Sequence, residues 1–188
     1  IADPQSLVFS PPFLLLALVN PAPSLWAMDM TVLAAVTVGG IGVLLLFRDR
    51  GWPWAGELVR ALVFGFGAAM AWRIQHTGQV LSLAYLPLAL VCLERAIQRP
   101  SIVYGALSGL FAAFIVHGRD QVALLAIYLL IGATLWMIAT SDRPRTTLRR
   151  SILPLLAGGI VGVALITLPV AMTAVLAAES NRPTIDFI

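Results

Sequence analysis

Two short polar turns carry side chains that can bind anions and transfer protons. Residues 73–79 read Arg-Ile-Gln-His-Thr-Gly-Gln, and residues 117–121 read His-Gly-Arg-Asp-Gln. Apolar runs flank both turns, and an unpaired polar group is costly in lipid, so we expect each turn to lie at a membrane surface or to line a wet cavity. Arginine side chains among histidine and amide groups could there hold a phosphate or a pyrophosphate.

The phosphate hypothesis rests on three arginines, Arg73, Arg119 and Arg182. A local alternative stays open, in which each arginine pairs with a neighbour in the chain, as Arg119 can with Asp120. Asp120 also has a structural interpretation as the N-cap of the helix that follows it, and this role does not exclude chemistry.

The two histidines, His76 and His117, do not predict a metal site. Each stands alone in its turn and lacks a second ligand one helical turn away. A hydrogen-bonding or proton-transfer role for His76 is favoured over metal ligation, with a plain interfacial histidine as the alternative. No glycine-rich phosphate loop, Gly-x-Ser-x-Gly motif or cysteine cluster occurs, so the sequence predicts no soluble-type nucleotide site and no resident cofactor.

The composition indicates an integral membrane protein. The chain has 188 residues, of which 60% are hydrophobic and 11% charged, and its mean hydropathy is +0.93; soluble domains have about 25% charged residues. All 12 basic residues are arginines, gathered mainly in short loops, which predicts orientation in a membrane and no nucleic-acid partner. The single cysteine, Cys92, lies in an apolar run, where a packing role is expected.

The pattern of apolar runs predicts an all-α integral membrane protein with about six transmembrane helices. Residues 1–23 are expected to form an extracytoplasmic loop with a short interfacial helix over 13–19, and residues 179–188 to start another extracytoplasmic segment. Residues 24–178 would form the bundle, with Ser24, Thr77 and Ser101 placed to cap helices. The predicted crossings are 25–47, 58–72, 80–97, 102–116, 122–140 and 152–178.

The arginine distribution predicts the orientation of this bundle. With six crossings, the loops 48–60, 94–100 and 141–151 share one side and hold nine arginines, and the other side holds three. The first side is then cytoplasmic. Both ends of the chain and both polar turns would face outward, in the manner of a bacterial inner-membrane protein. Because such proteins usually begin inside the cell, we expect at least one helix to precede Ile1.

The order of these segments resembles that of bacterial YfhO-like membrane proteins, which belong to the GT-C class of glycosyltransferases. Residues 3–12, Asp-Pro-Gln-Ser-Leu-Val-Phe-Ser-Pro-Pro, precede a leucine-rich run and resemble the first extracytoplasmic loop of that family. A crossing that ends in Leu-Leu-Phe-Arg, a Gly/Ala-rich helix and an Arg-x-x-His turn follow. Leu-Pro-Leu at 86–88 and Leu-Glu-Arg-Ala at 93–96 continue the similarity over most of the chain.

The resemblance implies an enzyme that uses a polyprenyl-phosphate-linked sugar at the extracytoplasmic face. Arg73, Arg119 and Arg182 would hold the lipid phosphate, and Asp120, Asp3 and His76 are the acid/base candidates. In this class the base is typically a carboxylate near the end of the first helix, in the first outer loop. Asp3 is a downstream member of that loop, so activity is expected only when the missing N-terminal part is supplied.

The expected partners are membrane lipid, the sugar donor, an acceptor that the sequence does not identify and, in one interpretation, other membrane subunits. A divalent metal has no support in the residue pattern. Two other functions stay open. One is a non-catalytic accessory subunit or packing module, in which the polar turns only cap helices. The other is a transporter, which would place charges near the membrane midplane, where only Asp29 comes close.

Overall fold

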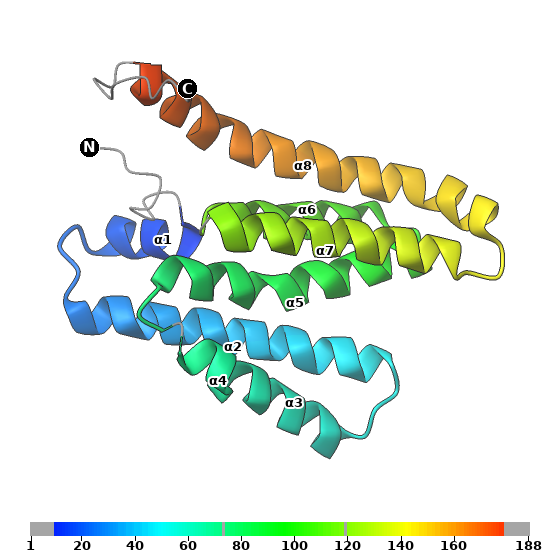
Figure 1. Cartoon of the computed structure of the whole chain (residues 1–188), viewed down its shortest axis with the longest axis horizontal. Helices are drawn as coiled ribbons and strands as arrows, with labels where there is room; N and C mark the ends of the chain where they lie inside the picture. The colour runs from blue at the N-terminus through cyan, green and yellow to red at the C-terminus, as the bar shows by residue number, and fades with distance from the viewer. Residues whose placement is uncertain (1–9, 73, 119, 179–188) are drawn as a thin grey trace, which may run out of the picture.

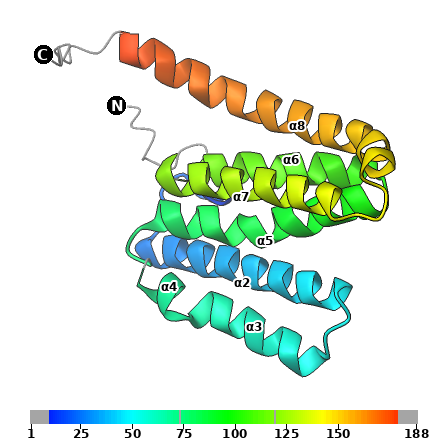
Figure 2. The ribbon, with the colours of Figure 1, turned by 45° about the vertical axis from the view of Figure 1, so that its right-hand side comes forward.

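The computed structural model describes residues 10–72, 74–118 and 120–178, and all regular structure in these ranges is helical. The elements lie side by side in layers, with α3 outermost, followed by α2, α5, the pair α6 and α7, and finally α8 (Figures 1 and 2). The helices are α1 (Pro11–Val19), α2 (Leu25–Asp49), α3 (Trp54–Phe66), α4 (Ala68–Ala71), α5 (Thr77–Gln98), α6 (Ile102–Val116), α7 (Asp120–Ala139) and α8 (Pro144–Ala178).

Four helices among the described residues are long and apolar enough to cross a membrane. They are α2, α5, α7 and α8, and the 22 residues of α5 extend about 33 Å, close to the thickness of a bilayer core. The predicted crossing over 58–72 is instead divided into α3 and α4 at Gly67, and the 15 residues of α6 fall short of a full span. The prediction of a helical membrane protein therefore agrees with the structure, and six crossings stay a prediction.

Successive long elements run in opposite directions along the bundle (Figure 1). The ends of α2, α5 and α7 consequently meet the beginnings of α3, α6 and α8 at one extremity. We call it the arginine-rich end because the segments 48–60, 94–100 and 141–151 lie there. The opposite extremity holds the connections from α4 to α5 and from α6 to α7, and we call it the polar-turn end.

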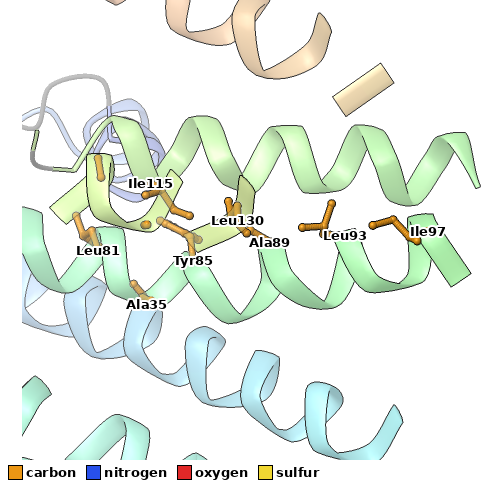
Figure 3. Close-up of a cluster of buried hydrophobic side chains, with 11 residues drawn as sticks. Ala35, Leu81, Tyr85, Ala89, Leu93, Ile97, Ile115 and Leu130 are labelled. Carbon is orange, nitrogen blue, oxygen red and sulfur yellow. The ribbon is translucent and has the colours of Figure 1, made fainter. Parts of the chain in front are cut away.

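Helix α5 forms the centre of the bundle. Along one of its faces, a buried apolar residue recurs at every fourth position. Leu81, Tyr85, Ala89, Leu93 and Ile97 are all buried and pack toward α6 and α7 (Figure 3). In its most apolar 18 residues, 67% are buried, compared with 6% for α8. The ring of Tyr85 lies 5.3 Å from that of Phe114, centroid to centroid, in an edge-to-face contact that ties α5 to α6.

Glycines allow α6 and α8 to approach at backbone distance. A Cβ atom added to Gly105 would lie 2.6 Å from the carbonyl carbon of Pro154, and one on Gly109 would lie 2.7 Å from that of Gly158. Such distances are far below ordinary contact, so only glycine fits at these two positions. The glycine spacing in the sequence predicts close helix packing, and the structure identifies α6 and α8 as the partners.

The sequence predicts N-caps at Ser24, Thr77 and Ser101, and the structure confirms these predictions in part. The Ser24 hydroxyl accepts a hydrogen bond from the Ala27 N–H at 3.2 Å, as the capping prediction requires. Ser101 stands at the N-cap of α6 without a capping bond, and His76, not Thr77, takes the N-cap position of α5. Helix α8 begins at Pro144, eight residues before the predicted start, because proline is well suited to a first helical turn.

Candidate functional site

The two polar turns come together because the start of α5 packs against the end of α6. The Ser82 hydroxyl lies 2.9 Å from the Ile115 carbonyl oxygen, which accepts its hydrogen bond across the helix interface. A Cβ atom on Gly118 would lie 2.5 Å from the Gly78 carbonyl oxygen, so the two backbones touch where the first turn ends and the second begins. The end of the first turn and the start of the second therefore lie together at the polar-turn end.

An apolar cluster supports this place from within the bundle. Val32 and Val36 of α2, Met70 of α4 and Val80 of α5 are buried together, and Phe13 of α1 packs against them. Helix α1 has no buried residue of its own, and Phe13 is its contact with this cluster. The cluster gives the beginning of α5 a rigid base.

His76 is exposed at the N-cap of α5, and its side chain makes no capping hydrogen bond. His117, at the C-cap of α6, is half-buried, and its Nδ1 donates to the Ala113 carbonyl oxygen of its own helix. Because that carbonyl can only accept, Nδ1 carries the hydrogen, and Nε2 of a neutral His117 is left as the acceptor. The position of His117 in a polar turn does not predict this hydrogen bond to its own helix.

Most of the predicted site lies outside the described residues. This applies to Asp3, Arg73, Arg119 and Arg182, and for Asp120 the structure describes the backbone at the start of α7 but not the side chain. Of the six predicted residues, the structure therefore describes the side chain of His76. In the described ranges, no group of three or more His, Cys, Asp and Glu side chains is placed to hold a metal ion.

At the arginine-rich end, arginine side chains form ion pairs and contacts with aromatic rings that the sequence does not predict. Arg95 of α5 donates from Nε and Nη2 to the two carboxylate oxygens of Asp49 at 2.7 and 3.1 Å, and its guanidinium lies 5.4 Å from the centre of the Tyr104 ring of α6. Arg50, directly after α2, forms an ion pair with Glu94. These contacts join the ends of α2 and α5 to the start of α6, which agrees with the prediction that their loops share one side.

A third arginine at this end covers aromatic rings. The guanidinium of Arg60 in α3 lies 3.7 Å from the centre of the Trp52 ring and 4.7 Å from that of Phe47. From the sequence, these arginines predict the orientation of the bundle but not these contacts.

Comparisons with known proteins give no relative from which a function could be transferred: no family model matches the chain, and no curated protein or solved structure is significantly similar to it. The class of the protein follows from its structure: with four helices long and apolar enough to cross a membrane among the described residues, it is a multi-pass helical membrane protein.

Proposed function

We propose that this chain is part of a polytopic glycosyltransferase of the bacterial inner membrane. The enzyme would use a polyprenyl-phosphate-linked sugar at the extracytoplasmic face, where the polar-turn end would lie. The observation that carries the proposal is the direct packing of α5 on α6 through Ser82, Ile115 and Gly118, since it brings the two polar turns to one extremity of the bundle. The resemblance to YfhO-like proteins supplies the reaction class.

The proposed topology has six crossings, in which α3 with α4, and α6, complete the four longer helices. The nine arginines at the arginine-rich end favour a cytoplasmic position for it. The polar-turn end then faces outward, together with the remaining three arginines. An arginine on that side runs against the usual distribution of charge, which supports a binding role for Arg73, Arg119 and Arg182.

The proposed reaction transfers the sugar from phosphate to a hydroxyl. A carboxylate or imidazole, for which Asp120, Asp3 and His76 are the candidates, takes the proton of the acceptor hydroxyl as its oxygen attacks the anomeric carbon. The bond between that carbon and the phosphate oxygen breaks, and the lipid phosphate leaves with the electron pair. Arginine side chains stabilise the negative charge that develops on the leaving oxygen.

The test measures binding of a short-chain polyprenyl phosphate to the protein in neutral detergent micelles. We expect Arg73→Ala or Arg119→Ala to weaken binding at least about tenfold, because each removes a charge-assisted hydrogen bond to phosphate. Arg145→Ala is the matched control, since Arg145 is exposed in the first turn of α8, at the opposite end of the bundle. Circular dichroism establishes that each variant is folded. Unchanged binding in both Arg73→Ala and Arg119→Ala would remove the basis of the proposal.

A further inference from the structure

A recess of about 470 Å³ opens at the arginine-rich end. Its walls come from Arg50 after α2, from the last turns of α5 and α7 with the residues that follow them, and from the first turns of α8, so it joins segments up to a hundred residues apart in the chain. The residues that line it are Arg50, Glu94, Ile97, Gln98, Pro100, Trp136, Met137, Thr140, Ser141, Thr147 and Arg150. A second recess of about 490 Å³ adjoins it and shares Ser141, Thr147 and Arg150.

The side chains that line the recess carry a net positive charge, from Arg50 and Arg150 against Glu94. Glu94 is already paired with Arg50. Arg150 has no carboxylate within ion-pair distance in the part of the chain that the structure describes. The side chains of Thr140, Ser141 and Thr147 line the same space. The Thr140 and Ser141 hydroxyls donate to the carbonyl oxygens of Trp136 and Ile138, which leaves the Thr147 hydroxyl to donate to a ligand. An arginine beside a hydroxyl donor matches the oxygen atoms of a phosphate group.

One wall of the recess is apolar and continues onto the outer surface of α7. Trp136 is 71% exposed, and its neighbour Leu135 is 64% exposed. Tryptophan side chains concentrate at the level of lipid headgroups, between the hydrocarbon core and water. A ligand bound at Arg150 could therefore place its anionic part beside the Thr147 hydroxyl while its apolar part runs along α7.

We propose that this recess binds the phosphate group of an anionic phospholipid, with Arg150 as the principal contact and Trp136 against the acyl chains. The site is at the opposite extremity from the proposed sugar-transfer site and does not depend on it. Because the segments 48–60, 94–100 and 141–151 hold nine arginines against four carboxylates, this end of the bundle as a whole also attracts anionic lipid. Beyond this general attraction, the recess gives the lipid phosphate a specific contact with Arg150.

The experiment titrates delipidated protein in neutral detergent with bromine-labelled phosphatidylglycerol and measures the quenching of tryptophan fluorescence. We expect saturable quenching, and Arg150→Gln should raise the apparent dissociation constant about tenfold or more, because it removes a charge-assisted hydrogen bond. Arg145→Gln is the matched control. It removes the same charge from the same helix, at a position that lines neither recess, and should change the constant less than about twofold.

A second variant keeps the proposal testable if Arg150→Gln does not fold. Thr147→Val removes one hydroxyl donor without a change of charge and should weaken binding several-fold. Equal effects of Arg150→Gln and Arg145→Gln would overturn the site in favour of diffuse attraction. Bromine-labelled phosphatidylcholine binding as tightly as phosphatidylglycerol would also overturn it. If inorganic phosphate at millimolar concentration displaced the lipid with the same dependence on Arg150, the phosphate site would stand and the lipid assignment would fall.

Discussion

The contact between α6 and α8 can be tested by one added methyl group, in the variant Gly109→Ala. The new Cβ atom would lie 2.7 Å from the carbonyl carbon of Gly158 and nearer still to its oxygen. Both atoms belong to the backbone, so no side chain can rotate away, and the helices must separate by roughly 1.5 Å at this crossing to restore ordinary contact.

The expected loss of stability follows from two opposing effects. Overpacking of this kind costs about 1–3 kcal/mol, and a collision with backbone belongs near the upper limit. Alanine recovers up to about 1 kcal/mol through its higher helix propensity. We therefore expect Gly109→Ala to lower the free energy of unfolding by about 2 kcal/mol, a decrease of roughly 30-fold in the folding equilibrium constant.

The measurement is unfolding by sodium dodecyl sulfate in mixed micelles, followed by circular dichroism. Gly159→Ala is the matched control on α8, since nothing lies within 4 Å of a Cβ atom at that position. It should leave stability unchanged or raise it by up to about 1 kcal/mol. If Gly109→Ala proved as stable as Gly159→Ala, then α6 and α8 would not be in backbone contact, and the position of α8 would need revision.

Three further predictions concern single side chains. Ser82→Ala should lower the free energy of unfolding by about 1 kcal/mol, because the Ser82 hydroxyl donates across the interface to Ile115, and a smaller change than Ser151→Ala gives would refute this. Ser151→Ala should be neutral or slightly stabilising in the same assay, since the buried Ser151 hydroxyl has no hydrogen-bond partner among the described residues. Arg60→Ala should cost about 1 kcal/mol and shift tryptophan emission by uncovering Trp52, whereas Arg60→Lys should give a smaller shift; an unchanged spectrum in both would contradict the stacked geometry.

The sequence allowed prediction of the helical class and of several helix limits, because these depend on local composition. The helix predicted over 25–47 extends to Asp49, and Ser24 caps it. The break at Gly67 was not foreseen, since Gly/Ala-rich runs read equally well as one continuous close-packing helix. The start of α8 was placed too late because its arginines were assigned to a loop, although Pro144 and the residues after it are helical.

The long-range contacts could not be predicted, because they depend on pairing between distant residues. Glycine spacing indicated that helices pack closely, but only the structure identifies Pro154 and Gly158 as the partners of α6. The same holds at the arginine-rich end, where the ion pair between Asp49 and Arg95 joins positions 46 residues apart. For the candidate site, the sequence identified polar turns whose neighbouring backbones meet, while the roles of most site residues stay predictions.

The central claim is that the polar-turn end and the arginine-rich end face opposite sides of a membrane. Helix α5 tests it directly, since His76 and Gln98 are exposed just before its start and at its end. In a Cys92→Ala background, which removes the only cysteine, cells carrying His76→Cys or Gln98→Cys are treated with a membrane-impermeant maleimide. We predict labelling of position 76 in intact cells and of position 98 only after permeabilisation. Labelling of both positions in intact cells, or of position 98 alone, would contradict the account.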